Sequence, residues 1–512
     1  MARRAGILVP LFSIPSSRSW GVGEIGDLPV LAEWLRSAGQ RILQLLPINE
    51  MPPDERSPYS ALSAMAIDPQ FISLRQLEDF EALGGEPQLE PDLRDRVKRA
   101  RAARTVDYAT VRGLKQVALR RSFARFRDVE WHSKSPRAAA LRTYLEDEAG
   151  WLGDYALFRA LHARHHERPW LEWPEPLRHR DPVALAQARE ELADDILYRQ
   201  YVQWVAQNQW TAARTASHGV ALFGDLPFMV SGDSADVWAR QDEFRLDASV
   251  GVPPDAFSET GQDWGLPVYR WDVLAERDFE WLRLRARRNA VLFDGYRVDH
   301  LVGFYRTYFR PQGGGAAVFT PSDEEAQTRL GERVLQVFRE PGAEIIAEDL
   351  GVVPDFVRES LARQGIPGYK VLRWERHWNT EGRPFKDPED YPACAVATSG
   401  THDTEPMATW WADAPAEEKE AVRAIPSVRA RAGDGDRVGD ALIESLLASG
   451  ADLVILPIQD VFGWQDRINQ PATVADSNWT WRLPWPVDGM VDEPEARDAA
   501  ARLVAWTRRY GR

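Results

Sequence analysis

Residues 294–304 read DGYRVDHLVGF. The stretch has the apolar spacing of a β-strand end, but ionisable side chains interrupt it. Strand side chains alternate between two faces, so Arg297 and Asp299 share one face while Tyr296 and Val298 share the other. We expect the apolar pair to pack against helices and the charged pair to face the interior of the fold. A fold for this chain therefore has to place an arginine and an aspartate inside a layer of strands.

Seven other short apolar runs resemble this one, and most of them end in polar residues. With it, the predicted strands are residues 7–13, 42–48, 220–230, 293–300, 344–350, 369–374, 394–403 and 452–461. Helical patterns lie between most of them, for example at residues 27–38, 279–292, 324–338, 355–364 and 439–448. Strands that alternate with amphipathic helices indicate an α/β fold with parallel pairing. Eight such units predict a closed (β/α)8 TIM barrel.

The predicted barrel has one long interruption, between its second and third strands. That region contains charged, helix-prone segments at residues 92–104, 141–149 and 182–208. We expect a single catalytic barrel over residues 1–512, with a mainly helical insertion subdomain at 52–215. Residues 251–265 contain two prolines and three glycines, and we expect a long loop there.

Composition narrows the functional classes. The 512 residues carry a net charge of −15, which argues against a nucleic-acid partner. Cys394 is the only cysteine, so an intrachain disulfide and a cysteine zinc site are excluded, and a cytoplasmic location fits. No segment approaches 18 uninterrupted apolar residues, so no membrane-spanning helix is expected.

Acidic side chains end three of the predicted strands. They are Asp299, one of the pair Glu348 and Asp349, and Asp403, which follows His402. In a barrel the carboxyl ends of the strands carry the active site. The neighbouring arginine favours the ionised form of Asp299, which suits either a nucleophile or a purely structural ion pair. Two carboxyl groups about 5–5.5 Å apart, one ionised and one able to donate a proton, are what retaining cleavage of a glycosidic bond requires.

Other barrel chemistries are less well supported. A metallohydrolase would begin with an HxH motif on the first strand, and residues 7–13 have none. The loops after strands seven and eight are not glycine-rich, as a phosphate site would require. No GxGxxG or P-loop pattern follows a strand. We therefore expect neither a metal nor a cofactor.

Longer motifs in the chain fall in a specific order. They are SPYS (57–60), GDLPFMVSGDSADVW (224–238), GVPPDAFSETGQDWG (251–265), GYRVDH (295–300), IAEDLG (346–351), GTHDTE (400–405), QDVFG (459–463) and NWTWR (478–482). In these motifs, from about residue 6 to about residue 482, the chain resembles the 4-α-glucanotransferases. These enzymes, also called amylomaltases or disproportionating enzymes, form glycoside hydrolase family 77 of the α-amylase superfamily.

The resemblance implies roles for the three acids. Asp299 would be the nucleophile, Glu348 the general acid/base and Asp403 the stabiliser of the transition state. Arg297 would orient Asp299.

The resemblance also implies a set of substrate-binding residues. His300 and His402 would hydrogen-bond the bound glucose, and Tyr59 would stack on it. Further substrate-binding residues would be Asp225, Asn469 and, from the predicted loop, Asp255, Gln262 and Trp264. Two stretches depart from the family pattern, namely Thr404–Glu405 and residues 372–378 (LRWERHW).

The activity implied is transfer of α-1,4-glucanosyl units between maltooligosaccharides, or to glucose, by a retaining double displacement. The partners would be these sugars and glucans derived from starch or glycogen. Two alternatives stay open: an amylase-like hydrolase, and a non-catalytic glucan-binding protein on the same barrel. In a transferase, a lid over the cleft would favour a sugar acceptor by excluding water, and residues 251–265 are the candidate lid.

Overall fold

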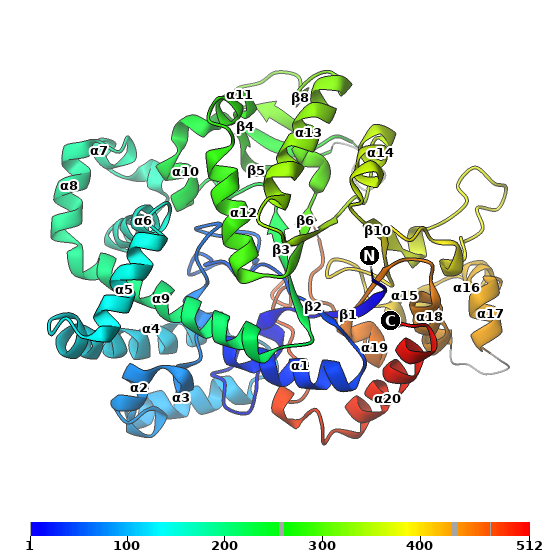
Figure 1. The fold of residues 1–512 in the computed structure, drawn as a ribbon, viewed down its shortest axis with the longest axis horizontal. Helices are drawn as coiled ribbons and strands as arrows, with labels where there is room; N and C mark the ends of the chain where they lie inside the picture. Colours follow the sequence, from blue (N-terminus) through cyan, green and yellow to red (C-terminus); the bar gives the residue numbers. More distant parts are fainter. Residues whose placement is uncertain (1, 255–260, 433–437, 472) are drawn as a thin grey trace.

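The computed structural model describes residues 2–254, 261–432, 438–471 and 473–512. Eight parallel strands close into a barrel in the order β1-β12-β11-β10-β9-β6-β3-β2. They are β1 (Arg4–Leu8), β2 (Ile42–Gln44), β3 (Ala221–Pro227), β6 (Gly295–Asp299), β9 (Glu344–Ala347), β10 (Gly368–Val371), β11 (Ala395–Thr398) and β12 (Leu453–Pro457). Each overlaps one predicted strand, so the predicted (β/α)8 barrel is confirmed (Figure 1).

Every predicted strand runs past the carboxyl end of the observed strand, and three of them show why. β1 stops before Pro10, which has no N–H to donate, and Leu11–Ser13 form a 3-10 turn. β12 stops at Pro457, and helix α19 (Ile458–Phe462) begins directly after it. β10 gives way to another 3-10 turn at Leu372–Trp374. Apolar composition alone does not distinguish a strand from the tight turn that ends it.

The helices around the barrel agree with the pattern read from the sequence. The five predicted ones are α1 (Leu28–Ser37), α12 (Glu280–Leu292), α13 (Glu324–Arg339), α14 (Asp355–Gln364) and α18 (Val438–Ala448). The others outside the insertion are α10 (Ala235–Ala239), α11 (Trp271–Glu276), α15 (Met407–Asp413), α16 (Ala416–Arg423), α17 (Pro426–Ala432) and α20 (Pro494–Arg509).

The stretch between β2 and β3 is mostly helical and lies on the left of Figure 1. Its helices are α2 (Glu78–Ala82), α3 (Pro91–Ala102), α4 (Tyr108–Arg125), α5 (Pro136–Asp147), α6 (Leu152–Arg164), α7 (Glu175–Arg178), α8 (Pro182–Glu191) and α9 (Ala193–Ala216). α9 packs against both α6 and the barrel helix α1. The boundary of the subdomain at residues 52–215 stays a prediction, because α9 contacts both parts.

A second sheet was not predicted from the sequence. It has the order β5-β4-β7-β8 and is antiparallel, with β4 (Phe244–Val252), β5 (Gln262–Tyr269), β7 (Thr307–Pro311) and β8 (Val318–Thr320). The prediction of one loop over 251–265 is therefore wrong at both ends, where β4 and β5 pair. A side chain at Gly251 would come within 2.0 Å of the Gln262 carbonyl oxygen, so glycine permits the close pairing here.

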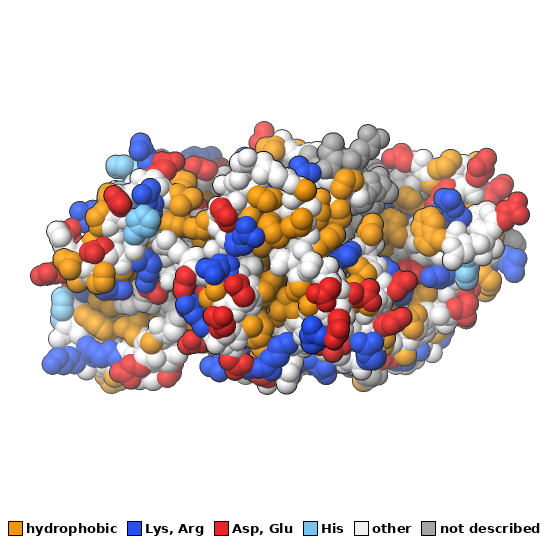
Figure 2. Space-filling view, turned by 90° about the horizontal axis from the view of Figure 1, so that it is seen from above, with side chains coloured by type: hydrophobic (Ala, Val, Ile, Leu, Met, Phe, Trp, Pro, Cys, Tyr) orange, Lys and Arg blue, Asp and Glu red, His pale blue; other side chains and the backbone are white. Residues whose placement is uncertain are grey.

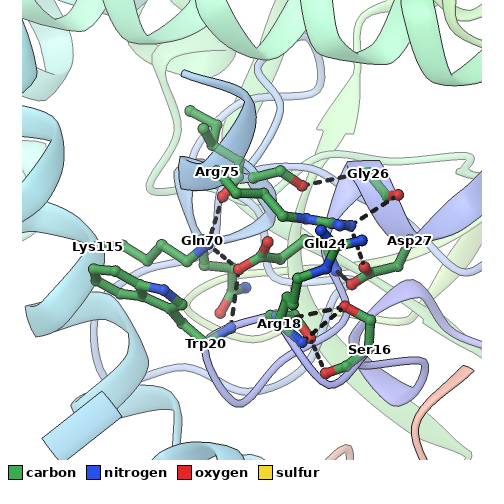
Figure 3. A network of polar contacts seen from close by, with 12 residues as sticks. Ser16, Arg18, Trp20, Glu24, Gly26, Asp27, Gln70, Arg75 and Lys115 are labelled. Atoms are coloured by element: carbon green, nitrogen blue, oxygen red, sulfur yellow. Dashed lines mark hydrogen bonds and ion pairs between the residues drawn. The ribbon is translucent and has the colours of Figure 1, made fainter. Parts of the chain in front are cut away.

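A closed network of charges joins the insertion to the segment after β1 (Figure 3). Lys115 of α4 lies 2.5 Å from Glu24, and both side chains are 1% exposed. Asp27 pairs with Arg75 at 3.0 Å and accepts a hydrogen bond from the Glu24 backbone. Burial, and next the charge of Glu24, raise the pKa of Asp27 to about 7. Each of the two carboxylates is paired with a cation, so the network holds two parts of the chain together.

Candidate active site

A cleft of about 560 Å³ opens at the carboxyl ends of the barrel strands. Its lining comes from the ends of β6, β9, β10 and β11, from β5 and from the loop after β12. The residues are Gln262, Trp264, Arg297, Asp299, His300, Glu348, Leu350, Arg373, Trp374, Thr401, Asp403, Thr404, Glu405, Arg467 and Pro471. This is the end of a (β/α)8 barrel that carries the active site in characterised enzymes.

Strand β6 alternates as expected. The hydroxyl of Tyr296 donates to the carbonyl of Phe338 on α13, at 3.0 Å, so the apolar face of the strand meets the helices. Arg297 points into the barrel, and its side chain is only 5% exposed. Asp299 follows it on the same face, at the rim. The prediction that the charged pair faces the interior is confirmed.

Arg297 connects three carboxyl groups. One guanidinium nitrogen donates to both oxygens of Asp225, at 2.8 and 2.7 Å. Its second terminal nitrogen, Nη2, lies 2.7 Å from Asp299 and 4.0 Å from Glu348. Two carboxyl groups from neighbouring strands thus face the same nitrogen. Asp225 is fully buried, whereas Asp299 is 30% exposed and reaches the cleft.

Glu348 directly follows β9 and differs in environment from Asp299. Its side chain is 12% exposed and accepts hydrogen bonds from the backbone N–H groups of His300, at 2.8 Å, and Leu350, at 2.9 Å. Burial raises the pKa of Glu348 to about 7, although Arg297 acts in the opposite direction. The carboxyl group can therefore carry a proton near neutral pH.

The adjacent acid, Asp349, has a structural position. Its carboxylate accepts a hydrogen bond of 2.7 Å from the backbone of Tyr369 and so ties the end of β9 to β10. The sequence left open which of the two acids faces inward. In the structure, Glu348 lines the cleft and Asp349 does not.

Asp403 is held from two sides. Asn469 donates to it at 2.7 Å, and the ring nitrogen Nε2 of His402 lies 3.4 Å from it. Burial opposes ionisation, but the charge and hydrogen bonds of these neighbours hold the pKa of Asp403 well below its usual range. The same His402 nitrogen lies 3.0 Å from the Tyr59 hydroxyl, which donates to Asp225 at 2.8 Å. One chain of contacts therefore runs from Asp403 to Arg297.

The predicted substrate-binding residues fall into three groups. Gln262, Trp264, Arg297 and His300 line the cleft together with the three acids. The members of the second group contact the lining residues or one another, as just described, and are Tyr59, Asp225, His402 and Asn469. Asp255 lies outside the described residues.

Aromatic rings flank the cleft. Trp264 meets His300 edge-on, with ring centroids 4.9 Å apart, and Tyr59 stacks on His402 at 5.5 Å. Burial lowers the pKa of His300 to about 4, so the imidazole is neutral at neutral pH. A neutral imidazole and flat apolar faces suit a neutral, ring-shaped ligand.

Several lining residues were missed by the sequence prediction. Arg373 pairs with Glu405 at 3.3 Å, and both reach the cleft beside Trp374. The signal for them was present, because they lie in the two stretches that depart from the family pattern. Arg467 donates to the backbone carbonyl of Asp403 at 2.9 Å. The only indication of Arg467 in the sequence was its position two residues before Asn469.

Neither a metal-binding cluster nor a membrane-spanning helix occurs among the residues that the structure describes. No group of three or more histidine, cysteine, aspartate or glutamate side chains is arranged to hold a metal ion. In the same part of the chain, no helix has both the length and the apolar character needed to cross a membrane.

Comparisons with known proteins agree with this geometry. The chain is 35% identical over 498 residues to a 4-α-glucanotransferase of Thermus thermophilus, covering 94% of this chain and 95% of that protein. It is 31% identical over 500 residues to a 4-α-glucanotransferase of Chlamydia pneumoniae, covering 93% and 91%. The solved structure of an amylomaltase from Streptococcus agalactiae in complex with acarbose superposes with a TM-score of 0.84 at 26% identity, over 100% of this chain and 99% of that one. The model of glycoside hydrolase family 77, described as 4-α-glucanotransferase, matches residues 9–488, and the chain belongs to this family.

Proposed function

We propose that the chain is a 4-α-glucanotransferase in which Asp299 is the nucleophile and Glu348 the general acid/base. One observation carries the assignment. The two carboxyl groups face the same nitrogen of Arg297, yet only Asp299 is in direct contact with it, at 2.7 Å against 4.0 Å for Glu348. A nucleophile must be ionised and an acid protonated, and the direct contact of Asp299 with the guanidinium group and the burial that raises the pKa of Glu348 suit these roles.

The first half-reaction forms a covalent intermediate. A carboxylate oxygen of Asp299 attacks C1 of the donor glucose, and the bond from C1 to the glycosidic oxygen breaks. Glu348 transfers its proton to that oxygen, and the shortened glucan leaves with a free 4-hydroxyl group. The donor glucosyl unit is then an ester of Asp299.

The second half-reaction reverses these roles. The ionised Glu348 takes the proton of an acceptor 4-hydroxyl group, whose oxygen attacks C1. The ester bond to Asp299 breaks and the carboxylate is restored, so two inversions give net retention. Asp403, held ionised by His402 and Asn469, binds hydroxyl groups of the reacting sugar and stabilises positive charge at C1.

The remaining residues bind and position the sugar. His300 exchanges hydrogen bonds with its hydroxyl groups as a neutral imidazole. Gln262 and Trp264, which β5 holds at the edge of the cleft, exclude water from the intermediate and so favour a sugar acceptor. We propose a similar covering role for Asp255. We also propose that Tyr59 stacks on the glucose, that His402 hydrogen-bonds it, and that Asp225 and Asn469 complete the site.

We propose maltooligosaccharides, glucose and glucans derived from starch or glycogen as the substrates. A cytoplasmic location is also proposed, on the ground that the one cysteine in the chain allows no intrachain disulfide. Polar and charged side chains outnumber apolar ones in the lining of the cleft, as binding of a hydroxyl-rich carbohydrate requires.

Incubation with maltotriose tests the proposal. A transferase produces longer oligosaccharides together with glucose, while the number of reducing ends stays constant. A steady rise in reducing ends would instead identify the amylase-like hydrolase. Unchanged maltotriose, with sugar binding retained, would identify a non-catalytic glucan-binding protein.

A further inference from the structure

A groove of about 180 Å³ leads away from the active-site cleft. It shares four lining residues with the cleft, namely Gln262, Trp264, His300 and Leu350. The two hollows are therefore adjacent, and a glucan chain that leaves the cleft past these residues reaches the groove. The groove belongs to the second sheet, since β4, β5, β7 and β8 all contribute to its wall.

Two aromatic rings and a guanidinium group form one wall. Tyr308 on β7 is paired with Phe319 on β8, so their side chains lie on the same face with ring centroids 5.0 Å apart. The guanidinium carbon of Arg306 lies 4.2 Å from the centroid of Phe319. Figure 2 looks at the molecule from the side of this sheet and shows hydrophobic side chains gathered across the middle of the face.

Arg306 faces the groove without a compensating acid among the described residues. Burial lowers its pKa, and none of the described carboxylates acts against this. Gly351 and Val352 also line the groove, and Val352 is 69% exposed. An apolar side chain this exposed, in a groove that two aromatic rings also line, indicates a surface that a ligand covers.

The chemistry of the groove fits a sugar. The flat apolar face of a glucose unit packs on aromatic rings, and its hydroxyl groups accept hydrogen bonds from a guanidinium group. We propose that Arg306, Tyr308 and Phe319 bind a glucosyl unit of the α-glucan chain beyond the reacting sugars, so that the enzyme favours longer chains. This inference rests on the proposed function and extends it from the reacting sugars to chain length.

The test compares a short and a long substrate. In Arg306→Ala and Phe319→Ala, kcat/KM for maltoheptaose should fall about fivefold to tenfold, while kcat/KM for maltotriose stays within about twofold of the parent. Val318→Ala is the matched control. Val318 is the neighbour of Phe319 on β8, its side chain points to the other face of the strand, and it should change neither value.

A binding measurement separates this inference from the activity. In an Asp299→Asn background, adding Arg306→Ala should raise the Kd for maltoheptaose by the same factor, measured by calorimetry. An unchanged Kd would overturn the inference, as would an equal loss of kcat/KM for both substrates, because the groove would then act only through Trp264 and His300. A parent enzyme without transfer activity would overturn the proposed function, and the Kd comparison would still decide the role of the groove.

Discussion

Two of the buried charge clusters among the described residues differ in one respect, because one is closed and the other opens to the active-site cleft. In the closed cluster, Lys115 and Glu24 are each 1% exposed, and Asp27 beside them is inaccessible. In the open cluster, Arg297 is similarly buried, at 5%, but Asp299 in front of it is 30% exposed. Both contain a cation that touches a carboxylate at hydrogen-bonding distance. The difference is whether the carboxylate also faces a space that a substrate can fill.

An ion pair that is predicted from the sequence can be either structural or catalytic. Desolvation acts on both clusters, raising the pKa of Asp27 and of Glu348 to about 7. A shifted pKa therefore does not by itself indicate catalysis. In the closed cluster each charge is already satisfied, so its removal should affect folding. In the open cluster the carboxylates are held but accessible, so their removal should affect turnover.

Replacing the nucleophile should have the largest effect. Asp299→Asn should lower transfer from maltotriose by about 10⁴-fold or more, because an amide cannot form the glycosyl ester. The thermal unfolding midpoint should change little, since Asp299 is partly exposed. Asp294→Asn is the control at the opposite end of the same strand. Asp294 pairs with Arg214 at 2.6 Å, and its loss should affect stability and leave transfer intact.

Transfer that persists in Asp299→Asn would show that the open cluster is structural, like the closed one. The assignment of the nucleophile would then be wrong. Chromatography of the oligosaccharide products, with a thermal melt of both variants, gives the two readouts that the comparison needs.

Replacing the general acid should have the next largest effect. In the parent, kcat/KM for maltotriose should fall as the pH rises through about 7, because Glu348 loses the proton that the leaving oxygen needs. Glu348→Gln should lower kcat/KM by about 10²- to 10⁴-fold and should no longer show this loss at high pH. Asp349→Asn, one residue away, should keep the dependence, since Asp349 accepts a backbone hydrogen bond from Tyr369 and lies 3.9 Å from Arg358 instead of lining the cleft.

Removing the cation of the closed cluster should give the opposite pattern. Lys115→Met leaves Glu24 buried without its cation, and the free energy of unfolding should fall by about 3–5 kcal/mol. Below the unfolding transition, kcat/KM should equal that of the parent. Denaturant titration measures the first value and maltotriose turnover the second.

The double variant Lys115→Met/Glu24→Gln should recover part of this loss, because no uncompensated charge is left. Arg121→Met is the surface control. Arg121 and Glu90 are 42% and 56% exposed, and this loss should leave the free energy of unfolding nearly unchanged. Equal destabilisation in Lys115→Met and Arg121→Met would show that burial does not distinguish the two pairs.

The sequence predicted the open cluster better than the closed one, for a physical reason. Acids that end apolar strands converge at one end of a barrel, so Asp299, Glu348 and Asp403 could be placed together without knowing any contact. Lys115 lies in a helix among arginines, and its partner Glu24 is 91 residues away. No periodicity shows that this lysine is buried. Only the packing of α4 against the segment after β1 determines it.

The second sheet was missed for a related reason. β4 carries Arg245 and Asp247 on its exposed positions, and β8 has only three residues. Such strands lack the apolar runs that identified the barrel. Their pairing depends on tertiary contacts. In particular, β4 pairs with β7, which lies far from it in the sequence. The contacts of Arg297 with Asp225 and Glu348 were likewise beyond prediction, since strand register sets them.

The smallest expected effect belongs to a neutral neighbour of the open cluster. Asn469 donates to Asp403 at 2.7 Å and is 8% exposed, so Asn469→Ala removes one hydrogen bond to a charged group. We expect kcat/KM to fall roughly tenfold to a hundredfold, corresponding to about 1.5–3 kcal/mol. Asn289 is also 8% exposed, but it donates to the backbone carbonyl of Arg285 within α12. Asn289→Ala should therefore lower the unfolding midpoint and leave kcat/KM unchanged. If both variants lose stability and neither loses activity, Asp403 does not depend on Asn469. The open cluster would then be confined to the acids in contact with Arg297.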